Sequence, residues 1–143
     1  MGGTFDPIHY GHLVTAECAR VRFGLDRVWF VPAGQPPHKP PESVTPAHHR
    51  YVMTEMATLS HHAFTVSRID VDRPGPTFTV DTLMALRREL GSEPELFFIT
   101  GADAILDILT WKTPERVLEL CCFIAATRPG FSLERLAMRL GEL

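Results

Sequence analysis

The chain has 143 residues, a length that suits one domain with a sizeable buried core. Its net charge of −3 at pH 7, with no cluster of Lys or Arg, argues against a nucleic-acid-binding surface. The three cysteines form no CxxC pair, and no apolar run approaches the roughly 20 residues of a membrane-spanning helix. We therefore expect a cytoplasmic protein that binds neither nucleic acid nor membrane.

The first twelve residues, MGGTFDPIHYGH, combine small residues with two histidines. Gly2 and Gly3 let backbone N–H groups approach a ligand, and the pattern over residues 12–21 predicts a helix directly afterwards. A glycine turn that leads into a helix N-terminus binds anions. His9 and His12 can donate hydrogen bonds to an anion whose charge grows during a reaction. We interpret the segment as a catalytic phosphate site; two ordinary surface histidines or half a metal site are the alternatives.

The next segments predict a strand, a long loop, a helix and a second strand. The continuous apolar run over residues 27–31 is typical of a buried parallel strand. A loop rich in proline follows, up to Thr45. Thr45 and Pro46 predict a helix start, as N-cap and first-turn proline. Alternation over residues 64–69 predicts the second strand.

Helical and strand-like segments continue to alternate in the second half of the chain. In chain order we expect a turn at residues 73–76, a helix at 80–90 closed by Gly91, a strand at 95–100, a short helix after 101–103, a helix at 114–120, a strand at 122–126 and a helix at 133–140. The methionines at positions 53, 56 and 84 are expected in helix cores. This alternation predicts a parallel sheet with right-handed crossovers.

Ligands of such sheets bind beyond the carboxyl ends of the strands. The Gly2-Gly3 turn, residues 101–103 and Arg128 each follow a predicted strand. We therefore expect all three at one edge of the sheet.

Four further side chains are candidates for ligand contacts. Lys39 lies in the proline-rich loop and is either part of a lid or a solvated lysine. Arg50 is unfavourable to the dipole near a helix start, so it has another role, either in binding or in a structural ion pair. Asp103 can accept from ribose hydroxyls, hold Mg²⁺ or cap a helix. Trp111 is either a stacking platform for a ring or a core residue.

Several stretches, taken in order, resemble a known family along essentially the whole chain. Residues 2–12 resemble the HxGH motif of the nucleotidylyltransferase superfamily. The stretches that narrow the resemblance to bacterial nicotinate-nucleotide adenylyltransferases are Pro36–Lys39, Arg73–Leu83, Gly101–Asp103, Trp111–Lys112 and Arg128–Gly130. The HxGH motif alone fits any member of the superfamily, whereas the combination is specific.

The resemblance implies a Rossmann-like, doubly wound parallel α/β sheet, the nucleotidylyltransferase fold, in a single domain over residues 1–143. It also implies transfer of AMP from ATP to nicotinate mononucleotide, which gives deamido-NAD and pyrophosphate, with Mg²⁺. The attacking phosphate is already anionic, so positioning and charge stabilisation are expected to suffice. The catalytic residues would be His9 and His12.

The resemblance and the candidates above give two sets of expected ligand contacts. The expected ATP contacts are Gly2, Gly3, Thr4, Phe5, His9, His12, Gly101, Asp103 and Arg128. The expected contacts to nicotinate mononucleotide are Lys39, Arg50, Thr79 and Trp111. Asp103 is also a candidate Mg²⁺ ligand, with the ATP phosphates as the metal's main partners. Phe78 stands where many members have Tyr.

Two features depart from the family pattern. Only Met1 precedes the Gly2-Gly3 turn where an apolar first strand is expected, and the family's carboxyl-terminal phosphate-binding Ser-Ser-Thr motif does not appear. We therefore expect most of the first strand and the carboxyl-terminal subdomain to be missing. The alternative functions are another HxGH adenylyl- or cytidylyltransferase, or a catalytically impaired nucleotide-binding module. Homo-oligomer formation is left open.

Overall fold

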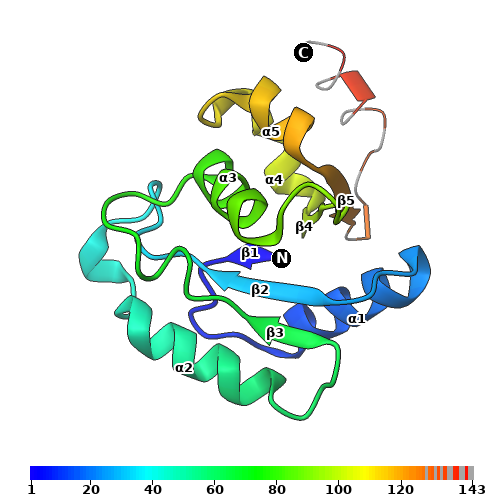
Figure 1. Cartoon of the computed structure of the whole chain (residues 1–143). Helices are drawn as coiled ribbons and strands as arrows, with labels where there is room; N and C mark the ends of the chain where they lie inside the picture. Colours follow the sequence, from blue (N-terminus) through cyan, green and yellow to red (C-terminus); the bar gives the residue numbers. More distant parts are fainter. Residues whose placement is uncertain (128, 131, 133, 135–136, 139–140, 142–143) are drawn as a thin grey trace. The chain divides into compact units, whose positions relative to one another are not determined.

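The computed structural model describes residues 1–127, 129, 130, 132, 134, 137, 138 and 141. The chain divides into two compact units, Met1–Phe78 and Thr79–Leu143 (Figure 1). Each unit contains parallel strands and helices, which is the α/β pattern predicted from the sequence. Among the described residues, no helix combines the length and the apolar character that crossing a bilayer requires.

The first unit contains a three-stranded parallel sheet. Its elements are β1 (Gly2–Gly3), α1 (Tyr10–Phe23), β2 (Val28–Pro32), a 3-10 turn (Pro41–Ser43), α2 (Ala47–Thr58) and β3 (Phe64–Val66). The strand order is β1-β2-β3, with Gly2 opposite Val31 and Val28 opposite Phe64. Phe30, in the central strand, is completely buried. Helix α2 packs against β2 and β3, beside which it runs in Figure 1.

Helix α1 begins two residues before its predicted start. His9 is its N-cap, in an extended conformation, and the chain leaves the helix at Gly24 with a φ of 62°. The N–H of this left-handed residue donates to the Arg20 carbonyl, which is the usual role of glycine at a helix end. The small residues Ala16 and Ala19 form the buried face and allow a close approach to the sheet.

Helix α2 starts differently from the prediction. Pro46, not Thr45, is the N-cap, and no side chain caps the helix, so the predicted Thr45 cap is wrong. The Thr45 N–H instead donates to Asp6 Oδ2 at 2.8 Å, which places Thr45 in the preceding loop.

The buried face of α2 is polar, because Arg50, Thr54 and Thr58 lie on it. Each threonine hydroxyl donates to the carbonyl four residues earlier, at 2.8 and 2.9 Å, so the buried hydroxyls are satisfied. Met56 is 73% exposed and Met84 is 41% exposed, so the core positions predicted for these two methionines are wrong.

Strand β3 is shorter than the predicted strand over residues 64–69. The Ser67 N–H still donates to the Phe30 carbonyl at 2.9 Å. The Ser67 hydroxyl then accepts from the Ile69 N–H at 3.2 Å, a local turn that ends the pairing.

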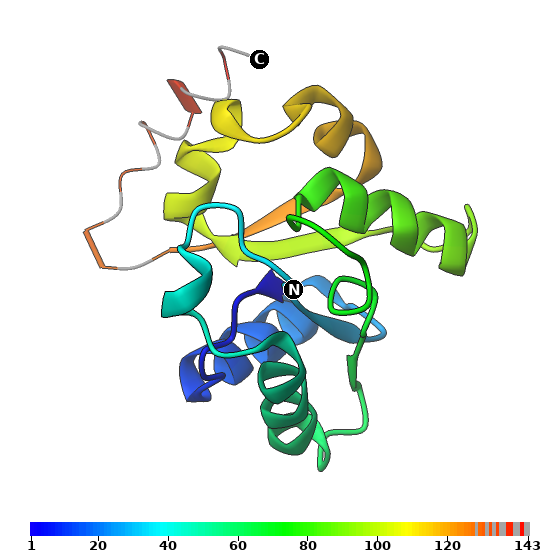
Figure 2. The same cartoon turned by 90° about the vertical axis from the view of Figure 1, so that its left-hand side faces the viewer.

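The second unit contains a two-stranded parallel sheet. Its elements are α3 (Thr79–Leu90), β4 (Phe97–Gly101), α4 (Ala102–Leu106), a 3-10 turn (Ile108–Thr110), α5 (Pro114–Leu120) and β5 (Cys122–Ala126). The strands pair in register from Phe97 with Cys122 to Gly101 with Ala126. Helices α3 and α5 pack side by side (Figure 2). Ile99, Ile108 and Val117 form the centre of this unit's core.

The elements predicted between residues 80 and 126 are therefore confirmed in type and order. Gly91 ends α3 with a φ of 78°, and its N–H donates to the Arg87 carbonyl at 3.0 Å. The helix predicted over residues 133–140 lies largely outside the described residues, as does Arg128.

Candidate active site

Gly2 and Gly3, expected in a loop, form the short strand β1, and the N-terminal loop that follows, residues 4–9, is built around the buried ring of Phe5. Phe5 has a φ of 49°, a conformation that costs a non-glycine residue on the order of 1 kcal/mol or more. Its ring is 3% exposed and packs against Phe30 and His12, with ring centroids 5.9 and 5.1 Å apart. A Cβ on Gly3 would lie 3.0 Å from this ring, so a larger residue there would require the Phe5 ring to shift slightly. The packing of the Phe5 ring thus stabilises a positive φ that is unfavourable for a residue other than glycine.

The two histidines of the HxGH stretch lie together at the start of α1. Their rings stack with centroids 3.8 Å apart and an interplanar angle of 27°. A Cβ on Gly11 would lie 3.0 Å from two atoms of the His9 ring. The glycine between the histidines therefore leaves room for the His9 ring beside the helix.

His12 is oriented by contacts on two sides. Its Nδ1 accepts a hydrogen bond from the His9 backbone N–H at 3.2 Å, and its ring meets the Phe5 ring edge-on. Burial, together with the charge of His9, lowers the pKa of His12 below its ordinary value of 6.5. His12 is therefore neutral at pH 7. Because Nδ1 is an acceptor, the proton of the neutral ring is on Nε2, which can donate to an anion.

The proline loop, residues 33–46, is tied to the N-terminal loop at two places. Lys39 Nζ donates to the Thr4 hydroxyl at 3.2 Å. The Asp6 carboxylate accepts from Thr45, whose hydroxyl and backbone N–H hold the pKa of Asp6 below its ordinary value. The predicted lysine therefore lies beside the predicted phosphate-binding turn.

Arg50 is completely buried, and its guanidinium contacts backbone carbonyls. It donates to the carbonyls of Thr45 at 2.7 Å, Thr4 at 2.7 Å and Gly34 at 2.9 Å. Burial lowers its pKa, partly offset by the charge of Asp6. This position gives a ligand no access to Arg50, so the placement does not support the predicted contact to a mononucleotide.

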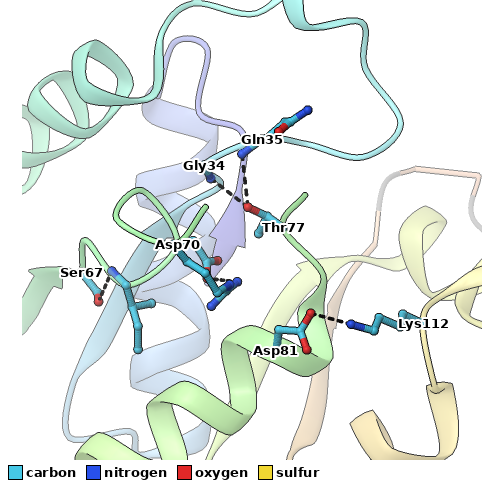
Figure 3. Close-up of polar contacts among 9 residues, drawn as sticks. Gly34, Gln35, Ser67, Asp70, Thr77, Asp81 and Lys112 are labelled. Atoms are coloured by element: carbon cyan, nitrogen blue, oxygen red, sulfur yellow. Dashed lines mark hydrogen bonds and ion pairs between the residues drawn. The ribbon is translucent and has the colours of Figure 1, made fainter. Parts of the chain in front are cut away.

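A further cluster, which the sequence did not reveal, holds the start of the proline loop. The Thr77 hydroxyl accepts from the N–H groups of Gly34 and Gln35, at 3.0 and 3.2 Å (Figure 3). A side chain on Gly34 would collide with the Asp70 carbonyl. The Asp70 carboxylate, which is 3% exposed, accepts from Arg73 at 2.6 Å. Thr77 lies within the quoted stretch Arg73–Leu83, but threonine by itself is too common to indicate this role.

The second unit contains three of the other predicted site residues. Gly101 ends β4 and is the N-cap of α4, and the exposed Asp103 lies in the first turn of that helix. Thr79 is the first residue of α3. Gly101 is therefore at the carboxyl end of a parallel strand and Asp103 just beyond it, where ligands of α/β sheets bind.

Trp111, the fourth, directly follows the 3-10 turn Ile108–Thr110 and is half-buried. Its ring packs against Phe98 and Phe123, with centroids 6.3 and 6.0 Å apart. The next residue, Lys112, donates to Asp81 on α3 at 2.9 Å (Figure 3). The Phe98 ring on β4 and the Phe123 ring on β5 thus hold the indole of Trp111, part of which is exposed to solvent.

The predicted common edge of the Gly2-Gly3 turn, residues 101–103 and Arg128 stays a prediction. Gly2 and Gly3 form β1 in the first unit, residues 101–103 belong to the second, and Arg128 lies outside the described residues.

Comparison with known sequences gives consistent matches. The model of the cytidylyltransferase-like family matches residues 1–140. A probable nicotinate-nucleotide adenylyltransferase of Moorella thermoacetica is 62% identical over 136 residues, 95% of this chain and 63% of that protein. A protein of the same name from Thermoanaerobacter sp. is 54% identical over 143 residues, all of this chain and 68% of that protein. The chain thus spans about two thirds of the length of these curated relatives.

Solved structures share the fold. One is Plasmodium falciparum nicotinic acid mononucleotide adenylyltransferase complexed with APC, with a TM-score of 0.74 at 24% identity, over 96% of this chain and 67% of that one. The same enzyme complexed with NaAD gives a TM-score of 0.65 at 21% identity, over 94% of this chain and 76% of that one. These matches confirm the predicted nucleotidylyltransferase fold. The family model over residues 1–140, with 54% identity to a relative of which this chain covers 68%, shows that the chain belongs to the nicotinate-nucleotide adenylyltransferases, within the cytidylyltransferase-like family.

Proposed function

We propose that the protein transfers AMP from ATP to nicotinate mononucleotide. A phosphate oxygen of the mononucleotide attacks the α-phosphorus of ATP, the bond to the bridging oxygen of the β-phosphate breaks, and deamido-NAD and pyrophosphate form. The observation that carries this proposal is the stacked pair of His9 and His12 at the start of α1, directly after the N-terminal loop. The names of the relatives support the choice of substrates.

The site chemistry fits this reaction because the nucleophile needs no deprotonation. Charge moves onto the leaving pyrophosphate, so catalysis depends on alignment and on donors aimed at the growing charge. His12 is a neutral donor through Nε2, held by its Nδ1 contact to the His9 backbone. His9, exposed beside it, is the second donor.

The remaining ligand contacts are proposed from their positions. ATP is expected on the backbone of residues 2–5 and on Gly101, Asp103 and Arg128. The mononucleotide is expected near Lys39 and Thr79, with its ring on the indole of Trp111.

Mg²⁺ is proposed as the cofactor, bound mainly by the phosphates of ATP. Among the described residues, no group of three or more His, Cys, Asp or Glu side chains is arranged to hold a metal ion. Mg²⁺ commonly keeps several waters and binds through substrate phosphates with one or two carboxylates, and Asp103 is our candidate carboxylate. The metal would neutralise charge on the phosphates.

We also propose that the protein is located in the cytoplasm, because its three cysteines do not form the pattern of a disulfide framework.

The test is pyrophosphate release by the purified protein with ATP and Mg²⁺. We expect release with nicotinate mononucleotide and much slower release with nicotinamide mononucleotide. Faster release with the amide would overturn the proposed substrate. Binding of ATP without product from either mononucleotide would favour a nucleotide-binding module instead.

A further inference from the structure

Arg50 joins three segments that are far apart in the sequence. Its three contacts are to the N-terminal loop at Thr4, to the start of the proline loop at Gly34 and to the end of that loop at Thr45. The contact to Thr4 spans 46 residues. One guanidinium therefore holds both ends of the proline loop against the loop expected to bind ATP.

A buried cation with this arrangement is costly unless it is well hydrogen-bonded. Removing a guanidinium from water carries a desolvation penalty, and the contacts here are to neutral carbonyls. Only the planar fork of arginine offers donors in three fixed directions at once, whereas the ammonium of lysine is a compact point charge. The geometry thus suits a role in orienting the backbone.

The contacts determine the direction of two peptide groups in the N-terminal loop. In a trans peptide, the carbonyl and the following N–H point in opposite directions. The Thr4 carbonyl faces Arg50, so the Phe5 N–H points away from it. The Gly3 carbonyl accepts from the Ala33 N–H at 2.8 Å, so the Thr4 N–H points away from β2.

These two N–H groups are suited to an anion. Within the described part of the chain, neither the Thr4 nor the Phe5 N–H has a hydrogen-bond partner. Successive backbone N–H groups directed outward form an anion-binding concavity.

We propose that Arg50 is a positioning residue for ATP, which directs the Phe5 N–H towards the phosphates by holding the Thr4 carbonyl. This inference rests on the proposed function in taking ATP as the ligand. It replaces the role in mononucleotide binding predicted from the sequence.

The experiment compares Arg50→Lys with the wild type in ATP binding, measured by calorimetry with Mg²⁺ and without mononucleotide. Lysine keeps the charge but cannot hold three carbonyls, so we expect an affinity for ATP about tenfold lower, the size of one charged hydrogen bond. The matched control is Thr58→Val, a buried change on the same helix whose hydroxyl bonds only within that helix. We expect this control to lower the melting temperature and leave ATP affinity unchanged.

Wild-type ATP affinity in a folded Arg50→Lys protein would overturn the proposal. A raised KM for the mononucleotide with unchanged ATP binding would also overturn it, in favour of a direct ligand contact. If the variant does not fold, amide NMR of the wild type decides: the Thr4 and Phe5 N–H signals must shift when ATP is added, and no shift refutes the proposal. A failure of the proposed function can be told apart from a failure of this proposal, because in that case the wild-type protein releases no pyrophosphate.

Discussion

At the scale of single residues, His12 has the most clearly defined chemistry. Its Nδ1 is engaged by the His9 N–H, its ring is held by Phe5, and its lowered pKa leaves a neutral ring with a donor at Nε2. The HxGH spacing identified both histidines as a pair. Their stacking and the tautomer came from the tertiary structure, because the tautomer follows from the hydrogen bond that the His9 N–H donates to His12 Nδ1 and the stacking from the placement of both rings.

Replacing His12 by alanine should slow the proposed reaction strongly. Loss of a donor aimed at developing charge costs on the order of 10²-fold in kcat. The measurement is pyrophosphate release under saturating substrates, with His62→Ala as the control, because His62 is an exposed histidine in the turn after α2. A His12→Ala rate near that of the control would remove His12 from the catalytic residues.

The pKa of His12 also predicts how stability depends on pH. The folded protein resists protonation of His12, while the unfolded chain protonates near the ordinary value of 6.5. Stability is therefore lost as pH falls through that value, because the unfolded state then binds more protons. Urea unfolding at about pH 8 and about pH 5.5 should show a larger loss for the wild type than for His12→Gln. Equal losses would contradict the lowered pKa.

At the scale of elements, helix α1 was predicted well and helix α2 less well. The pattern over residues 12–21 identifies α1 locally, and the left-handed Gly24 ends the helix in the structure. The buried face of α2 is made of Arg50, Thr54 and Thr58, whose polar groups are satisfied within the protein. Periodicity of apolar residues cannot reveal such a face, and it wrongly placed Met56 inside.

The substitution Gly11→Ala is expected to affect the stability of α1 and the position of the His9 ring differently. Gly11 is the second residue of α1, where alanine favours the helix by less than the ~1 kcal/mol of a helix interior. Its Cβ would lie 3.0 Å from the exposed His9 ring, which has to move away. We expect an unchanged or raised melting temperature and a rate about tenfold lower. Cys18→Ala, an exposed change on the same helix, is the control and should keep full activity. Full activity in Gly11→Ala would show that the His9 position is unimportant.

At the scale of the whole molecule, parallel strands alternate with helices in both units, as the sequence predicted. Strand β1 is two residues long and pairs with β2. The predicted site residues are divided between the units: His9, His12 and Lys39 belong to the first, and Gly101, Asp103 and Trp111 belong to the second.

The three cysteine thiols differ in burial, and we therefore expect them to differ in reactivity. Cys18 and Cys122 are exposed, whereas Cys121 is 8% exposed and burial raises the pKa of its thiol to about 11. Because the thiolate is the reactive form, a colorimetric thiol reagent at pH 8 should modify Cys18 and Cys122 quickly. Cys121 should react only after unfolding in guanidinium chloride. Three fast thiols in the native protein would contradict the packing of the second unit's core.

The sequence by itself determined the class of fold, the order of most elements and the pairing of His9 with His12, because apolar periodicity, glycine at turns and the HxGH spacing are local properties. Only the tertiary structure decided the burial and carbonyl contacts of Arg50, the hydrogen bond from the Gly34 N–H to Thr77 and the orientation of His12. Most of the partners in these contacts are backbone groups. Every residue carries the same carbonyl, and nearly every residue the same N–H, so no sequence pattern marks the ones that folding brings to a given side chain.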